Sequence, residues 1–280
     1  MTEYAECPGA RRSYDISPAL LIARNEFSML MDQPLTFILS LVVLSIAVIH
    51  AAGNSIILSD AASLFPPGEV LIIMGMDNSF LYTTMFCSFL ALCVGVISIS
   101  GERSSGSMRV LLAKPLYRRD VVAGKFLGGS LFMLVAVSAT LLVSVAGMLI
   151  TYRGAVLYWE LLVATCLYCL ILFIYCSLTL GIAMLIGSFF KDRSAALIAS
   201  FCYLYFGFID TGYLNGLGSL RRMDPYFLYT SAFSPVDKTV FDMNGSIATW
   251  LSLAMPYIAL LLIEAIIVFL LNCIVFNEEV

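Results

Sequence analysis

The chain alternates long uncharged apolar stretches with short polar ones, and this pattern predicts helices that cross a membrane. A crossing helix needs about 20 predominantly apolar residues with few charges. Five stretches of this kind contain no Asp, Glu, Lys or Arg, and a sixth contains one acid, Glu264, near its middle. We therefore expect six transmembrane helices, at residues 35–58, 80–100, 126–152, 161–190, 194–209 and 251–276.

The composition excludes a water-soluble protein. Apolar residues make up 61% of the chain and charged residues 12%, whereas soluble domains have about 45–50% and about 25%. The net charge of −4 is too small to indicate a nucleic-acid partner. The expected fold class is an all-α integral membrane protein, with an N-terminal segment at 1–34 and one transmembrane domain at 35–280.

The basic residues are sorted between the two sides of the membrane. Lys and Arg in short flanking segments favour the cytoplasmic side. A cytoplasmic N-terminus places 11 of the 15 basic residues inside, and six crossings then bring the C-terminus inside as well. The first thirty residues lack the pattern of a signal peptide. We expect a multi-pass protein of the cell membrane with a retained first span and both termini cytoplasmic.

Residues 17–33 are expected to form a helix that lies along the membrane surface. Ser17 suits an N-cap, Pro18 suits the first helical position, and Pro34 stops the helix. Apolar side chains recur at helical spacing on one face, and polar ones fall on the other: Leu20, Ala23, Phe27, Leu30 and Met31 against Arg24, Asn25, Ser28 and Asp32. An amphipathic segment directly before a span is typical of an interfacial helix in contact with membrane lipids. A plain surface anchor explains the same pattern.

The basic loop at 101–125 predicts a contact with a partner. Met108, Leu111 and Leu112 are spaced to form the apolar side of a short helix. Arg109 and Lys114 flank that side, and Pro115 ends the helix. At the end of the preceding span, the acid Glu102 is expected to pair with Arg103 or Arg118. Sorting of positive charge to the inside would by itself explain most of the charge of the loop.

The order of motifs in this loop carries a family resemblance. The acid Glu102 is followed by Gly-Ser-Met at 106–108, Leu-Leu-x-Lys-Pro at 111–115, Arg-Arg-Asp at 118–120 and Gly-Lys at 124–125, and Ala-Arg-Asn-Glu stands upstream at 23–26. This order resembles the ABC-2 type permeases, the membrane subunits of one class of ATP-binding-cassette transporter. The resemblance extends along the whole chain, including six spans, both ends inside and a broken outer segment before the last span.

The resemblance implies that the loop carries a coupling helix, which sits in a groove of the ATPase subunit and is flanked by the N-terminal helix. The implied coupling positions are Glu102, Gly106, Met108, Arg109, Leu111, Leu112, Pro115, Arg118, Arg119 and Lys125. The positions of interest in the N-terminal helix are Leu20, Ala23, Arg24, Glu26, Phe27 and Leu30.

A transport role without catalysis in this chain follows from the same resemblance. The sequence has no G-x-x-x-x-G-K-[ST] phosphate loop, so ATP and Mg²⁺ are expected on separate ATPase subunits, and this chain is expected to bind no cofactor or metal and to have no catalytic residues. The family forms its pathway between two permeases, so a second copy or a related permease is expected, and export is the implied direction.

Two ionisable residues inside spans leave an alternative open. His50 and Glu264 lie at similar depths, and ionisable groups within spans are candidates for function. A pair between them would suit an ion-coupled secondary transporter or an intramembrane enzyme, while a His near the boundary and a Glu that reaches water are the simpler interpretation. A structural or sensory anchor with the permease fold is a third possibility.

The remaining features favour packing over chemistry. Cys166, Cys169 and Cys176 lie near one helical face and are expected to pack as small apolar residues. Met74 and Met76 could contact Cu(I), although interfacial packing explains them more simply. The outer segment 210–250 is rich in Gly, Pro and aromatic residues. These aromatics are expected to form an interfacial belt, although the resemblance implies short broken helices there.

Overall fold

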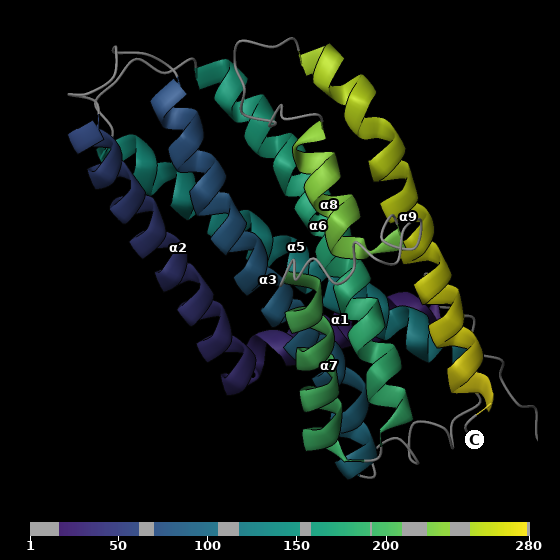
Figure 1. The fold of residues 1–280 in the computed structure, drawn as a ribbon. Coiled ribbons are helices and arrows are strands. Elements are labelled where there is room, and N and C mark those ends of the chain that lie inside the picture. Colours follow the sequence, from purple (N-terminus) through teal and green to yellow (C-terminus); the bar gives the residue numbers. More distant parts are fainter. Residues whose placement is uncertain are drawn as a thin grey trace, which may run out of the picture.

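The computed structural model describes residues 17–61, 70–105, 118–151, 158–190, 192–208, 223–235 and 247–278, and the regular elements in these ranges are helical (Figure 1). In chain order they are α1 (Pro18–Asp32), α2 (Pro34–Ala61), α3 (Val70–Ser105), α5 (Arg118–Thr151), α6 (Tyr158–Phe189), α7 (Arg193–Phe208), α8 (Pro225–Phe233) and α9 (Ile247–Glu278).

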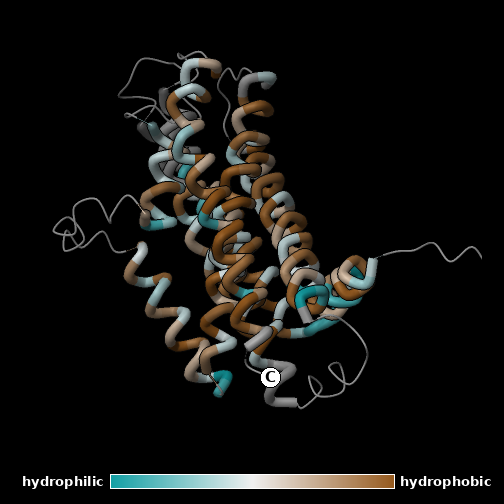
Figure 2. Tube along the Cα trace, turned by 90° about the vertical axis from the view of Figure 1, so that its right-hand side faces the viewer, coloured by the Kyte–Doolittle hydropathy of each residue, from teal (hydrophilic) through white to brown (hydrophobic). Residues whose placement is uncertain are grey.

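Within the described residues, five helices are long and apolar enough to cross a membrane, which confirms an integral membrane α protein. The crossing stretches in the described residues are Pro34–Asn54, Ser79–Ser100, Arg119–Ile150, Leu161–Phe189 and Ile247–Phe276. They correspond to five of the six spans expected from the sequence. Figure 2 shows apolar residues along the middle of these helices and more polar residues toward their ends.

The stretch expected to form the remaining span at 194–209 is a shorter helix. Helix α7 has 16 residues and is therefore about 24 Å long, less than the hydrocarbon thickness of about 30 Å. Figure 1 shows α7 beside the lower half of the bundle and α8 beside the upper half. The end of α7 meets the start of α8, where the rings of Phe208 and Tyr226 lie 4.4 Å apart. Two short helices thus occupy this part of the bundle in place of one long helix.

The helices extend beyond the boundaries expected from hydropathy. The expected outer loop at 59–79 is helical at 59–61 and 70–79, and the expected inner loop at 101–125 is helical at 101–105 and 118–125. Polar residues can continue a helix past the hydrocarbon. Hydropathy therefore marks only the apolar part of a longer helix. Helix α6 ends at Phe189 and α7 begins at Arg193.

Helices α3 and α6 form the centre of the bundle. Most residues of their crossing stretches are buried, whereas few residues of α9 are. At Gly95 a Cβ atom would lie 2.6 Å from the Leu180 carbonyl oxygen and 2.7 Å from Ala183 Cβ, so the two helix backbones approach closely, as small residues allow in membranes. Helices α2 and α9 stand on opposite sides of the bundle, and α1 runs across its lower part (Figure 1).

Candidate functional site

Helix α1 forms as expected, with Pro18 at its start and Asp32 at its end. Ser17 occupies the N-cap position, but its side chain makes no capping hydrogen bond. Glu26 and Leu30 are buried against the protein, whereas Leu20 and Met31 are 61% and 49% exposed. The side of α1 that packs on the protein is therefore rotated from the expected apolar face and includes an acid.

A pair of glycines on α5 lets α1 approach the backbone of that helix. At Gly128 a Cβ atom would lie 2.6 Å from the Ala23 carbonyl oxygen and 2.8 Å from Glu26 Cβ, and at Gly124 it would lie 2.6 Å from Ile22 Cβ. Glycines four residues apart on one helix face are a common device for close packing of helices in membranes. The two glycines fix α1 across α5 at the point where Glu26 is buried.

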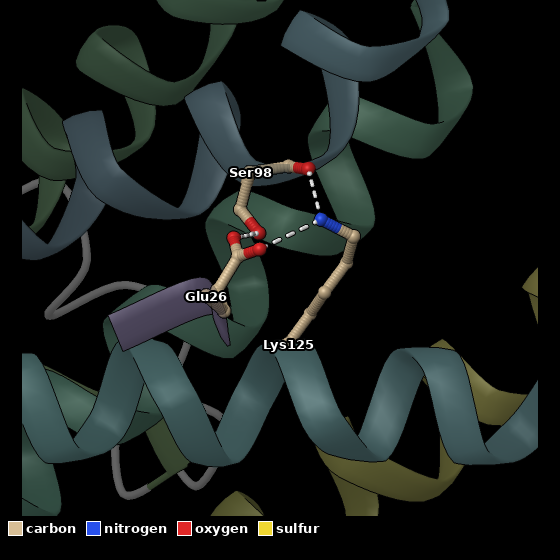
Figure 3. A network of polar contacts seen from close by, with 3 residues as sticks. All are labelled: Glu26, Ser98 and Lys125. Carbon is tan, nitrogen blue, oxygen red and sulfur yellow. Dashed lines mark hydrogen bonds and ion pairs between the residues drawn. The ribbon is translucent and has the colours of Figure 1, made fainter. Parts of the chain in front are cut away.

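Glu26, Ser98 and Lys125 form a buried charged cluster that joins α1, α3 and α5 (Figure 3). The Lys125 ammonium donates to Glu26 Oε2 at 3.0 Å and to the Ser98 carbonyl oxygen at 3.1 Å. The Ser98 hydroxyl donates to the other carboxylate oxygen, Glu26 Oε1. The side chains of Lys125 and Glu26 are only 1% and 4% exposed. We call these three residues the charged cluster.

The physical consequence of this burial is that the three helices hold together as one unit. Buried charges are tolerated when they are paired and hydrogen-bonded. Removal of one partner leaves an uncompensated buried charge, which is strongly destabilising. Any displacement that separates α1 from α3 or α5 must therefore break a charged hydrogen bond.

Glu26 and Lys125 were both candidate site residues from the sequence, but their pairing was not predicted. Lys125 was expected in the basic loop that faces a partner, and the structure instead buries it inside the protein. A usable signal was present, because Glu26 lies three and four residues from Ala23 and Leu30 on the packing face. A carboxylate on such a face requires a basic partner.

The charged cluster lies close to both helix ends that flank the candidate coupling loop. Ser98 and Lys125 are each seven residues from these ends, at Ser105 and Arg118, which is about 10 Å along each helix. Six of the candidate coupling residues lie outside the described residues: Gly106, Met108, Arg109, Leu111, Leu112 and Pro115. A displacement of the loop would reach the charged cluster through two short helical segments.

The coupling residues at the edges of the loop are placed only in part. Glu102 and Arg118 belong to α3 and α5, but their side chains lie outside the described part of the chain, and the pairing of Glu102 remains a prediction. The Arg119 side chain is 76% exposed and lies 4.0 Å from Asp120. Of the expected coupling residues, Arg119 is thus exposed, and Lys125 is buried.

Comparison with known protein families shows what kind of protein this chain is. A family model described as ABC-2 family transporter protein matches residues 20–279. The chain belongs to this family. A search of curated protein sequences finds no match. The ABC-2 family match and the five crossing helices make the chain a membrane component of a transporter, of a kind that associates with ABC ATPase subunits.

The two intramembrane ionisable residues of this ABC-2 protein do not meet. His50 stacks on Tyr82 of α3, with ring centroids 4.0 Å apart and an interplanar angle of 14°. Glu264 lies on α9, on the opposite side of the bundle from α2 (Figure 1). The suggested pair is therefore absent within one chain, because the two helices that carry it are separated by the core of the bundle.

A second polar cluster holds α8 against α3 and α6, and we call it the hydroxyl cluster. The Thr84 hydroxyl lies 2.6 Å from the hydroxyls of both Tyr168 and Tyr229. Tyr168 also donates to the Phe80 carbonyl oxygen at 2.9 Å, and the three side chains are buried. The aromatics of the segment 210–250 were expected to form an interfacial belt. Tyr229 contradicts this, because its hydroxyl group finds partners inside the bundle.

Trp250 is a second correction to the expected belt. It is 6% exposed, and its indole N–H donates to the Phe233 carbonyl oxygen at 3.3 Å. This bond ties the start of α9 to the end of α8. Tyr229 and Trp250 therefore stabilise contacts between helices, and do not form part of an interfacial belt.

Metal and thiol chemistry find no support among the described residues. The seven described cysteines are free, and no group of His, Cys, Asp and Glu in the described ranges could hold a metal ion. Cys176 is buried and Cys166 is exposed, so the expected cysteine face is divided between core and surface. The side chains of Met74 and Met76 lie outside the described residues.

Proposed function

We propose that this chain is the permease subunit of an ABC exporter that forms a substrate pathway with a second copy or a related permease. Separate ATPase subunits bind ATP and Mg²⁺ and drive the change of conformation. The observation that carries this proposal is the ABC-2 family match over residues 20–279. The buried charged cluster beside the coupling loop supports the mechanism.

The proposed transmission begins in the loop between α3 and α5. The ATPase engages Met108, Leu111 and Leu112, and its closure displaces the loop. Because the loop joins two helices that the charged cluster ties to α1, the movement is passed to three helices together. The interfacial helix α1 then moves with the bundle and does not remain as a passive anchor.

Ion-coupled transport or intramembrane catalysis receives less support from the described structure. Both would need polar groups gathered in one place within the membrane. The two candidates lie on helices at opposite sides of the bundle, His50 on α2 and Glu264 on α9. His50 instead packs its ring on Tyr82.

The experiment that tests the proposed function is affinity purification from the native host in mild detergent. A tagged wild-type chain is compared with Leu111→Asp/Leu112→Asp and with the control Leu111→Met/Leu112→Met. We expect an ATPase with a phosphate-binding loop to accompany the wild type and the Met control and to be lost from the Asp variant, because carboxylates cannot enter an apolar groove without desolvation.

Membrane insertion of all three proteins is checked first, so that a loss of the partner is not a loss of fold. Recovery of no ATPase with the wild type would contradict the proposal. Equal recovery with the Asp variant would move the contact away from this loop. Mass measurement of the purified complex reports whether one or two permease chains are present.

A further inference from the structure

A half-open groove lies between the end of α1 and the sides of α2 and α5. It encloses about 190 Å³. It is lined by Leu30 and Met31 of α1, Phe37 of α2, Leu90 of α3 and Val135 of α5. The groove thus lies where the interfacial helix meets two membrane-spanning helices.

The chemistry of the groove excludes a polar ligand. Its lining is almost entirely apolar, and the two hydroxyl side chains in it are already engaged. Ser40 donates to the Thr36 carbonyl oxygen at 2.8 Å, and Thr140 donates to the Ala136 carbonyl oxygen at 2.7 Å. A polar group placed here would lose its hydrogen bonds to water without replacement.

The mouth of the groove is continuous with the lipid-facing surface. Met31, Phe37 and Val135 are 49%, 62% and 45% exposed, and the latter two belong to membrane-spanning helices. Leu30 and Leu90, at the bottom, are 0% and 1% exposed. An apolar slot that opens sideways among crossing helices faces hydrocarbon, and water in it would find almost no hydrogen-bond partners.

The length and volume of the groove limit what can bind in it. From Phe37 to Leu44 the groove follows α2 for seven residues, or about 10 Å. Its volume is below the roughly 300–1,000 Å³ of pockets that take drug-sized ligands. A helix of a second protein, about 10–12 Å across with its side chains, would not fit within it. Part of one extended hydrocarbon chain would.

We propose that this groove binds one acyl chain of a phospholipid from the leaflet at the α1 end of the bundle. The headgroup stays at the surface beside the end of α1, where an interfacial helix meets the headgroup region. The acyl chain fills the space between α1, α2 and α5 and so adds apolar contacts to the unit that the charged cluster holds. The site is separate from the coupling loop and does not depend on the identity of the transported substrate.

Photolabelling tests this site directly. The full chain is placed in nanodiscs of phosphatidylcholine that carries a diazirine on one acyl chain, then illuminated and mapped by mass spectrometry. We expect label to concentrate on residues 34–44 of α2 and 132–140 of α5. Ala139→Trp, which fills the groove, should lower labelling at least fivefold, whereas Leu142→Trp should not, because Leu142 is 68% exposed on the same helix and does not line the groove.

A second measurement keeps the test valid if Ala139→Trp fails to fold. The wild type is exchanged into detergent before illumination, which removes loosely held lipid. Label that remains at the groove and is lost from Leu142 supports a binding site. Label spread evenly over exposed residues, or lost everywhere on exchange, would reduce the groove to ordinary lipid contact and overturn the proposal.

Discussion

The charged cluster and the hydroxyl cluster have the same structural role but different chemistry. Both attach a peripheral helix to α3, at Ser98 and at Thr84, and these two positions are 14 residues or about 21 Å apart along the helix. The first holds α1 with a buried ion pair, and the second holds α8 with neutral hydroxyls. The attachment of α1 is therefore far more sensitive to the loss of one group.

The difference in chemistry suggests different mechanical roles. A buried ion pair is destabilised strongly when either partner leaves, so the α1, α3 and α5 unit is expected to move as one body. Hydroxyl groups that share partners contribute modest net energies each, so α8 can shift with a smaller penalty. The loop that we propose for coupling joins the more strongly held helices.

The largest expected effect comes from removing the cation of the charged cluster. Lys125→Met should lower the free energy of unfolding by about 3–5 kcal/mol, because Glu26 is then left as a buried unpaired charge. Unfolding by sodium dodecyl sulfate in mixed micelles measures this change.

The matched control for this prediction removes both charges. Glu26→Met/Lys125→Met should be clearly more stable than Lys125→Met, because a buried ion pair can be replaced by apolar residues at little cost. Equal instability of the single and double variants would contradict the account of the charged cluster.

The next largest effect is expected where α1 touches the backbone of α5. Gly128→Ala should destabilise the protein by about 1–3 kcal/mol, since overpacking forces backbone shifts and the new Cβ atom would lie 2.6 Å from the Ala23 carbonyl oxygen. Gly53→Ala is the control, because its Cβ would meet nothing within 4 Å. Unfolding of the two variants at the same detergent fraction would contradict the close packing of α1 against α5.

A smaller effect is expected in the hydroxyl cluster. Tyr229→Phe should cost about 1 kcal/mol, the usual net value of a hydrogen bond, because it removes the hydroxyl that contacts Thr84 and Tyr168. Hydrogen exchange should become faster in α8 and stay unchanged in α1. Tyr205→Phe serves as the control, since Tyr205 is 54% exposed on α7. Faster exchange in α1 as well would show that the two clusters are not independent.

The smallest effect is expected at His50. His50→Phe keeps an aromatic ring against Tyr82, and aromatic pairs contribute only about 0.5–1.5 kcal/mol beyond their buried area, so the variant should retain stability and transport. Transport in vesicles, driven by ATP, is the measurement. A complete loss of transport with normal folding would favour the ion-coupled alternative.

The sequence predicted the parts of this molecule that depend on local composition. Crossing helices follow from uninterrupted apolar runs, and α1 follows from its proline signals and helical periodicity. The division of the stretch before α9 into α7 and α8 was harder to place, because Gly and Pro mark breaks without fixing which helix ends pack together. The predicted loop boundaries were wrong because hydropathy indicates which residues contact lipid and not where a helix ends.

The contacts that matter most for the candidate site depend on pairing across the chain. Glu26 and Lys125 are 99 residues apart, and no local pattern joins them. Tyr229 looked like an interfacial aromatic until its hydroxyl was placed beside Thr84, 145 residues away. His50 and Glu264 matched in depth but not in position around the bundle, which a single sequence does not report.

ATPase closure is expected to move α1, α3 and α5 together. The most direct test places spin labels, as unnatural amino acids, at Leu20 of α1, Leu127 of α5 and Leu260 of α9, which are 61%, 50% and 45% exposed. Distances are measured in the complex with its ATPase, with and without ATP under conditions that block hydrolysis. We predict an unchanged distance from Leu20 to Leu127 and a changed distance from Leu127 to Leu260. A change between Leu20 and Leu127, or no change in either distance, would contradict the account.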